Sequence, residues 1–210
     1  MAAKKKSKDE IEEVIDAGAT DIGENYVQEA EEMYNSLWEK AKSVRWHIIG
    51  HLQKHKINKA LEIFDVIQTV DSVKKTEEIN KRALIKGKQI SVFIEINIGN
   101  EVSKTGIKPE YGLVKNLARE ISMLKNVKLE GLMTMGPRFG DPEGNRSFFK
   151  NIIQIFDKLK SLDIPDTEMK YLSMGMSNSY KVAIEEGGNM IRPGTIIFGE
   201  RANPCKIDRY

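Results

Sequence analysis

Segments with the pattern of β-strands alternate with segments that have the pattern of α-helices along the whole chain. This alternation limits the possible folds more than any other feature. Short runs rich in β-branched and apolar residues occur at 20–25, 44–50, 64–70, 90–98 and 127–135, and again within 171–180 and 190–199. Between them, apolar residues recur every three or four positions, which is typical of amphipathic helices. Strands separated by helices run parallel, so the sequence predicts a parallel sheet with helices outside it.

The sheet is expected to close into a (β/α)8 TIM barrel. Seven strands are clear, and the alternation implies an eighth before the first helix, where only residues 1–4 remain. We therefore expect the first strand and the helix preceding it to be truncated. No Gly-x-Gly-x-x-Gly fingerprint follows an early strand, which disfavours an open doubly wound sheet. Because no linker or low-complexity tract interrupts the chain, we predict one domain over residues 1–210.

Composition and charge narrow the classes of function. The chain is 40% hydrophobic and 30% charged, which is enough apolar content for a core beneath a charged surface. Its net charge of +2 does not favour nucleic-acid binding. The one cysteine, Cys205, fits a reducing compartment, and no apolar run is long enough to span a bilayer. We expect a cytoplasmic protein that binds neither nucleic acid nor membrane.

Two turns near the end of the chain have the features of a phosphate site. The first contains Ser173 and Ser177 and leads into a helix, and the second, Pro193-Gly-Thr195, follows the next strand. Backbone N–H groups at the start of a helix suit a phosphate, and a TIM barrel places such turns after its last two strands. The alternative is that both are ordinary caps and turns, because Ser and Gly are common in loops.

The three histidines have a regular spacing like that of metal ligands, but the predicted secondary structure does not place all three on one face. His47, His51 and His55 are spaced by four, but the change from strand to helix at Gly50 leaves only His51 and His55 able to share a helix face. No acidic ligand is near in sequence, so we predict no metal site. Lys104 could line the mouth of the barrel and meet an anion, or it could be a solvated loop lysine.

Six motifs, in this order, resemble those of the pyridoxal phosphate homeostasis proteins. They are Gly23-Glu-Asn-Tyr-Val-Gln-Glu29, Trp46-His-Ile-Ile-Gly-His-Leu-Gln53, Ser103-Lys-Thr-Gly106, Gly131-Leu-Met133, Leu172-Ser-Met-Gly-Met-Ser177 and Ile191-Arg-Pro-Gly-Thr-Ile-Ile-Phe-Gly199. The resemblance runs from about Lys4 to Arg201, and the family in turn resembles the N-terminal barrel domain of alanine racemases. It implies a protein that binds pyridoxal 5′-phosphate (PLP) through a Schiff base. It also implies a non-enzymatic carrier or buffer of PLP, a monomer, whose recipients are PLP-dependent apoenzymes.

The resemblance assigns the Schiff base to Lys4. The family lysine stands at a fixed spacing before the Gly-Glu-Asn turn, and this spacing leads to Lys4. The neighbours depart from the family pattern, with Ala3 in place of Ser or Thr and Lys5 in place of Thr. Lys5 is the alternative Schiff-base residue, but side chains alternate along a strand, so Lys5 would point away from the barrel axis. Without the resemblance, three lysines near the N-terminus would indicate a solvated tail.

The other predicted PLP contacts lie around the same end of the barrel. They are Asn25, His47, Ser173, Met176, Ser177, Arg192, Gly194 and Thr195. The resemblance implies that Ser177, Gly194 and Thr195 hold the phosphate, that Met176 packs on the ring and that Asn25 bonds the cofactor. It implies that Arg192 faces the pyridine nitrogen and keeps it unprotonated, which makes the ring a poor electron sink. The structural alternatives are helix capping for Asn25 and Ser177, core packing for Met176 and a surface ion pair for Arg192.

Two other functions fit parts of this pattern. The first is a PLP-dependent amino-acid racemase or lyase, with Lys4 as base and His47 or Tyr180 as the second proton carrier. Racemases of this barrel type take a catalytic tyrosine from a second domain across a dimer, and the chain ends soon after its last strand, so we expect no catalytic turnover. The second is a barrel that binds a sugar phosphate without a Schiff base.

Overall fold

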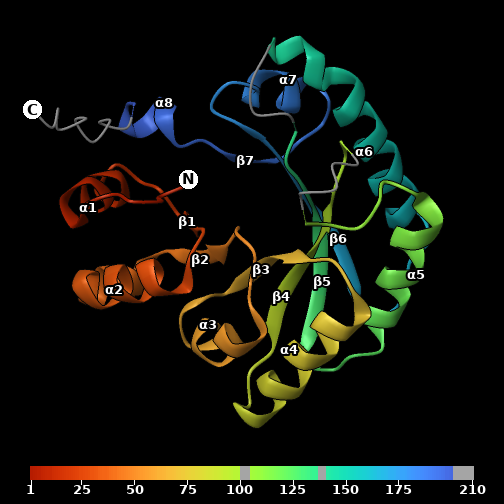
Figure 1. Cartoon of the computed structure of the whole chain (residues 1–210), viewed down its shortest axis with the longest axis horizontal. Coiled ribbons are helices and arrows are strands. Elements are labelled where there is room, and N and C mark those ends of the chain that lie inside the picture. The colour runs from red at the N-terminus through yellow and green to blue at the C-terminus, as the bar shows by residue number, and fades with distance from the viewer. Residues whose placement is uncertain (100–104, 137–140, 201–210) are drawn as a thin grey trace, which may run out of the picture.

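The computed structural model describes residues 1–99, 105–136 and 141–200. In this part of the chain, parallel strands pair in chain order from β1 to β7, and helices lie around the outside of the curved sheet (Figure 1). The strands are β1 (Asp21–Glu24), β2 (Arg45–Ile48), β3 (Val66–Val70), β4 (Ile90–Ile96), β5 (Val127–Thr134), β6 (Thr167–Met176) and β7 (Met190–Arg192). The α-helices are α1 (Lys8–Asp16), α2 (Val27–Leu37), α3 (Ile57–Ile63), α4 (Val73–Ile85), α5 (Tyr111–Ser122), α6 (Arg146–Lys160), α7 (Tyr180–Glu185) and α8 (Thr195–Phe198). Short 3-10 turns are η1 (Trp38–Ser43), η2 (Lys54–Lys56) and η3 (Pro142–Asn145). The predicted alternation is confirmed.

The N-terminal segment fills the gap between the two edge strands of the sheet. Ala2 forms a parallel bridge with Gly23 of β1. The N–H of Gly23 donates to the carbonyl of Met1 (2.6 Å), and the N–H of Ala3 donates to the carbonyl of Gly23 (2.9 Å). On the other side, the N–H of Ala2 donates to the carbonyl of Pro193, directly after β7 (2.8 Å). The predicted barrel is therefore confirmed, with a single bridge in place of its eighth strand, and backbone groups on both edges are paired.

The segment Ser7-Lys-Asp-Glu10 has the pattern of a capping box and predicts the start of α1, and Gly18 predicts its end. The hydroxyl of Ser7 accepts from the N–H of Glu10 (3.3 Å), and the Glu10 carboxylate accepts from the N–H of Ser7 (2.8 Å). This reciprocal capping box satisfies two N–H groups that the helix leaves free. The helix ends at Asp16, and Gly18 follows with a φ of +99°, a conformation that glycine adopts without strain.

Two helices begin later than predicted. The helix expected directly after Gly50 begins at Ile57, so His51 lies in a loop and does not share a helix face with His55. Gly50 packs so closely on the backbone of Asn25 that a Cβ there would overlap the Asn25 carbonyl. Pro109 predicts a helix start, because proline is favoured at the first helical position, but α5 begins at Tyr111.

The apolar side chains form two packed regions. The larger lies between the sheet and the helices, and α6 contributes Phe149, Ile152 and Phe156 to it. Each such side chain stabilises the fold by about 1.5–3 kcal/mol. The smaller region lies inside the sheet around Phe93, whose ring stacks on that of Tyr171 with centroids 5.6 Å apart. Among the described residues, no helix combines the length and the apolar character needed to cross a bilayer.

Candidate functional site

A cavity of about 570 Å³ lies at the carboxyl ends of the strands. Its lining includes most of the residues predicted from the sequence, namely Lys4, Asn25, Met176, Ser177, Arg192, Gly194 and Thr195. Ile49, Thr105 and Met135, each in a loop, complete much of the wall. TIM barrels bind their ligands at this face, because the loops after all the strands converge there. The fold therefore brings together residues that are up to 191 positions apart in the sequence.

The two neighbouring lysines at the start of the chain point into different cavities. Lys4 lines the large cavity, where its Nζ lies 3.4 Å from the hydroxyl of Tyr26 and 4.7 Å from the centre of that ring. Lys5 has a left-handed backbone, with a φ of +58°, and lines a separate pocket. The two side chains point apart, as predicted, but the predicted cause is wrong, because Lys4 and Lys5 lie in a turn and not in a strand.

The two predicted turns meet at the hydroxyl of Ser177. Its Oγ accepts from the N–H of Gly194 (2.9 Å) and from the N–H of Ile196 (3.3 Å). Ser177 follows β6, whereas Gly194 and Ile196 follow β7. The hydroxyl therefore joins the two turns. The N–H groups of Gly194 and Ile196 are both directed at the position of this oxygen atom. A phosphate oxygen is a stronger acceptor for such N–H groups than a neutral hydroxyl.

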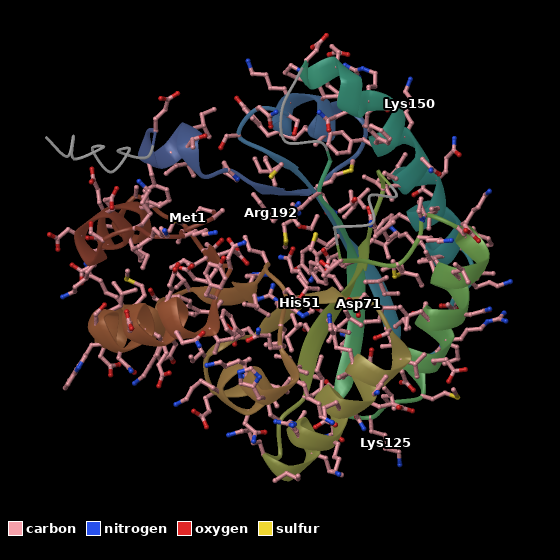
Figure 2. The ribbon with its side chains drawn as sticks, viewed as in Figure 1. Met1, His51, Asp71, Lys125, Lys150 and Arg192 are labelled. Carbon is pink, nitrogen blue, oxygen red and sulfur yellow. The ribbon has the colours of Figure 1, made fainter. Side chains whose placement is uncertain are left out.

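Arg192 lies at the bottom of the cavity, inside the curved sheet, whereas Lys125 and Lys150 point outward into solvent (Figure 2). Its side chain is buried, and it donates to the hydroxyl of Ser173 (2.5 Å) and to the carbonyl of Thr134 (2.6 Å). Burial lowers the pKa of Arg192 to about 10. The guanidinium therefore keeps its charge at neutral pH. The surface ion pair considered for this residue is wrong, because the charge sits in the interior.

His47 and Ser173 lie below the cavity and do not line it. His47 is buried, with its Nε2 2.8 Å from Asp21 Oδ1 and its Nδ1 2.9 Å from the Gln68 amide nitrogen. Ser173 donates to the amide oxygen of Gln68 (2.7 Å) and accepts from Arg192. Direct contact of His47 or Ser173 with the cofactor stays a prediction. In this structure both bond to other side chains of the barrel interior.

Two polar residues of the interior were not predicted from the sequence. Gln68 belongs to a strand in which every residue is buried, and Glu95 belongs to the apolar strand β4. Burial raises the pKa of Glu95 above its usual value, and the hydrogen bond from Thr105 to its Oε1 (2.9 Å) opposes this shift. A long polar side chain in a largely apolar strand is a signal that could have identified both residues, because such a side chain needs a hydrogen-bond partner when it is buried.

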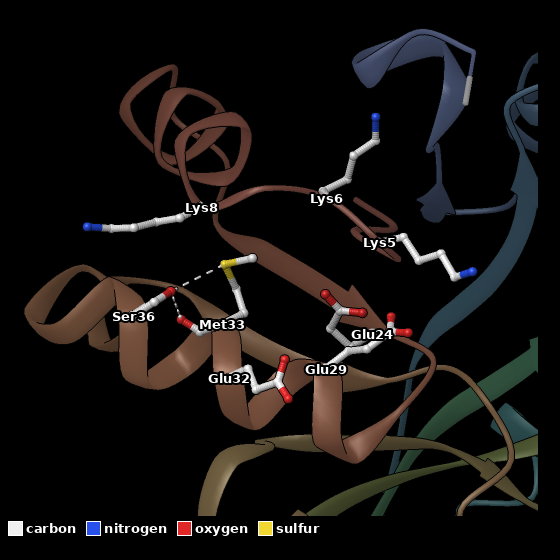
Figure 3. Close-up of a pocket in the computed structure, with 8 residues that line it drawn as sticks. All are labelled: Lys5, Lys6, Lys8, Glu24, Glu29, Glu32, Met33 and Ser36. Carbon is white, nitrogen blue, oxygen red and sulfur yellow. Dashed lines mark hydrogen bonds between the residues drawn. The ribbon is translucent and has the colours of Figure 1, made fainter. Parts of the chain in front are cut away.

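A second pocket, of about 430 Å³, lies between the N-terminal segment, the end of β1 and α2 (Figure 3). Lys5 and Lys6 lie on one side, and Glu24, Glu29 and Glu32 lie on the other. Glu24 is buried, and one of its carboxylate oxygens has no hydrogen-bond partner among the described residues. Burial and the neighbouring carboxylate of Glu29 raise the pKa of Glu24 to about 7.

Lys104 and Cys205 lie outside the described residues. Within residues 1–99, 105–136 and 141–200, no three His, Cys, Asp or Glu side chains are grouped so that they could hold a metal ion.

The barrel and its cavity define the class of protein. A family model described as the alanine racemase N-terminal domain matches residues 7–202. A solved alanine racemase of Clostridium difficile 630, in complex with cycloserine, superposes with a TM-score of 0.79. It is 16% identical and covers 97% of this chain and 55% of the racemase, so this likeness concerns the fold alone. The chain is therefore a barrel of the alanine racemase N-terminal type.

Closer relatives specify the family. The pyridoxal phosphate homeostasis protein of Aquifex aeolicus is 38% identical over 91% of this chain and 81% of that protein. The human protein of the same name is 34% identical over 95% of this chain and 74% of its own length. The structure of PipY from Synechococcus elongatus, with PLP bound, has a TM-score of 0.83 and 29% identity, covering 94% of this chain and 90% of PipY. The chain belongs to the family of pyridoxal phosphate homeostasis proteins, which confirms the resemblance found in the sequence.

Proposed function

We propose that this chain binds PLP in the large cavity, with Lys4 as the covalent attachment point, and takes part in PLP homeostasis without catalytic turnover. The observation that carries the proposal is the lining of the cavity. An amine, a buried guanidinium and two joined turns face one volume from three parts of the chain. The names of the relatives and the PLP-bound structure of PipY support the same cofactor.

The residues that line the cavity fit the chemical groups of PLP. When bound, PLP supplies an aldehyde, which can bond to the Nζ of Lys4 with loss of one water. Ser177 and the N–H groups of Gly194 and Ile196 would hold the phosphate, since these groups already converge on one oxygen position. Thr195 would contribute its hydroxyl or N–H to the same phosphate. Met176, at the end of β6, and Asn25, directly after β1, would contact the ring and its substituents.

The environment of Arg192 supports carriage of the cofactor over catalysis. A permanent positive charge next to the ring nitrogen disfavours protonation of that nitrogen. An unprotonated ring withdraws electrons poorly and therefore stabilises a carbanion poorly. Both ring nitrogens of His47, named as a proton carrier for a racemase, are engaged by Asp21 and Gln68. Tyr180, the other named carrier, begins α7 and is not among the residues that line the cavity.

The recipients and the setting follow from the same hypothesis. We propose that residues 1–210 act as one PLP-binding domain in the cytoplasm and pass PLP to PLP-dependent apoenzymes. Activation of an apoenzyme by the PLP-loaded protein, measured with a phosphatase present to destroy free PLP, tests this delivery. Activation no faster than that by an equal amount of free PLP under the same conditions would exclude it.

The first experiment is a visible absorbance spectrum of the protein with added PLP, before and after borohydride. A band at roughly 420 nm is expected for the wild type and absent in Lys4→Ala. Borohydride should remove this band by reducing the imine and leave the pyridoxyl group covalently attached to the wild-type protein. Lys5→Ala is the matched control, because the adjacent lysine points into another pocket and should keep the band. A band that survives in Lys4→Ala contradicts the assignment of the lysine.

The same samples separate the two rival functions. Loss of optical rotation in solutions of alanine or serine over hours would indicate a racemase and contradict the absence of turnover. A colourless wild type that binds sugar phosphates would favour a phosphate-binding barrel without PLP.

A further inference from the structure

A chain of side-chain hydrogen bonds crosses the interior of the barrel from the cavity to the opposite end. Arg192 Nη1 lies 2.5 Å from Ser173 Oγ, and Ser173 Oγ lies 2.7 Å from Gln68 Oε1. Gln68 Nε2 lies 2.9 Å from His47 Nδ1, and His47 Nε2 lies 2.8 Å from Asp21 Oδ1. The first four residues are each no more than 6% exposed. Asp21, at the amino end of β1, is half-buried.

Only one arrangement of the protons satisfies every member of this chain. A guanidinium can only donate, so Ser173 accepts from Arg192 and its hydroxyl proton is directed to the oxygen of Gln68. The amide nitrogen of Gln68 then faces His47, whose Nδ1 must accept. The single ring proton of His47 therefore sits on Nε2 and is donated to the carboxylate of Asp21. Gln68 is the link that makes this direction unique, because its amide has a donor at one end and an acceptor at the other.

The charges around the chain agree with this arrangement. Burial lowers the pKa of His47, which favours a neutral ring. The hydrogen bond from His47 lowers the pKa of Asp21 to about 2, so this carboxylate is ionised at neutral pH. The other charges that act on these groups are Arg45 and the N-terminal ammonium near His47, and Glu95 near Arg192.

We infer that Gln68 is a positioning residue for the cofactor site. It holds the hydroxyl of Ser173 so that this oxygen accepts from Arg192, and it keeps His47 as the neutral Nε2–H tautomer. The guanidinium at the bottom of the cavity is thereby linked through Gln68 to Asp21 at the other end of the barrel. The inference rests on the proposed function where it concerns PLP, whereas the state of His47 and Arg192 can be measured without PLP.

Two substitutions of Gln68 separate its two roles. Gln68→Met keeps the length of the side chain and removes both hydrogen bonds. The hydroxyl of Ser173 then loses its acceptor, and we expect PLP to dissociate with a constant about five- to tenfold higher. Gln68→Glu keeps an acceptor for Ser173 but presents an oxygen to His47 Nδ1. We expect His47 to become doubly protonated, with a PLP dissociation constant within about threefold of the wild type.

Thr69→Val is the matched control. Thr69 is the next residue of β3, is equally buried, and gives its own hydrogen bond to the carbonyl of Gly50 (3.0 Å). Its hydroxyl bonds to Gly50 and to no member of the chain, so this change removes one buried hydrogen bond and leaves the chain intact. PLP affinity and the ring signals of His47 should stay as in the wild type.

The measurements are imidazole nitrogen–proton NMR spectra and PLP titrations of the full chain at pH 7. Signals of the three histidines are assigned with His51→Gln and His55→Gln. We expect the neutral Nε2–H pattern for His47 in the wild type and a charged ring in Gln68→Glu. We also expect faster exchange of the Arg192 side-chain hydrogens with solvent in Gln68→Met.

Several results would overturn the inference. An Nδ1–H tautomer in the wild type would do so, as would unchanged Arg192 exchange or unchanged PLP affinity in Gln68→Met. A neutral His47 in Gln68→Glu would also contradict it. If Gln68→Met does not fold, the ring signals of the wild type and of Gln68→Glu decide the matter. A wild type that binds no PLP refutes the proposed function, and the NMR spectra of the PLP-free protein then decide the role of Gln68 separately.

Discussion

Replacement of Glu24 by glutamine should change how the stability of the protein depends on pH. The carboxyl group of Glu24 is 2% exposed, and its pKa is raised from 4.5 to about 7, first by burial and then by the carboxylate of Glu29. Between these two pH values the folded protein binds a proton that the unfolded chain does not bind. The free energy of unfolding therefore falls as the pH rises through this interval.

The size of this effect follows from the two pKa values. A difference of one in pKa corresponds to 1.36 kcal/mol, so full ionisation of Glu24, well above pH 7, costs the folded protein about 3 kcal/mol, most of it between pH 5 and pH 8. Glu24→Gln has nearly the same shape and no charge at any pH. Relative to the wild type, the variant should become more stable by about 2–3 kcal/mol between pH 5 and pH 8.

Urea unfolding followed by circular dichroism at pH 5, 6, 7 and 8 measures this difference. The change of the unfolding free energy with pH is the quantity to compare. Its absolute value in the variant also depends on whether the buried amide finds hydrogen-bond partners. Glu32→Gln is the control, since it removes a carboxylate from an exposed residue that lines the same pocket. It should change the unfolding free energy by less than about 0.5 kcal/mol at every pH. Parallel curves for wild type and Glu24→Gln would refute the reasoning.

Further changes test the local structure. Gly131→Ala places a Cβ against the carbonyl of Tyr171 and should cost at least about 2 kcal/mol in urea unfolding, whereas Gly112→Ala, in open space on α5, should be neutral or stabilising by up to about 1 kcal/mol. Equal effects would contradict the close approach of β5 and β6. Ser7→Ala should cost about 1 kcal/mol in thermal unfolding through loss of the capping box, and an unchanged midpoint would argue against it. Asp21 stabilises the fold above pH 3.8 and loses this contribution as the pH falls to about 2, so Asp21→Asn should be less stable than wild type at pH 7 and converge with it near pH 2; a constant difference would contradict this.

The order of the elements was already determined by the sequence. Apolar periodicity places the strands and helices, and the capping residues around Ser7 place the first helix. Parallel strands in chain order follow from the alternation, because each helix returns the chain to the same end of the sheet. These features depend on residues that are close together in the sequence, so the sequence alone is enough to predict them.

Only the tertiary structure decided how the polar residues of the interior are used. The sequence placed His47 and Ser173 among residues that touch the cofactor, and the fold bonds both to Gln68 below the cavity. The tertiary structure also decided that the N-terminal segment forms backbone hydrogen bonds with β1 on one side and with Pro193 on the other. These contacts join residues about 20 to 190 positions apart. Their geometry depends on the curvature and register of the whole sheet, and no local pattern of residues encodes it.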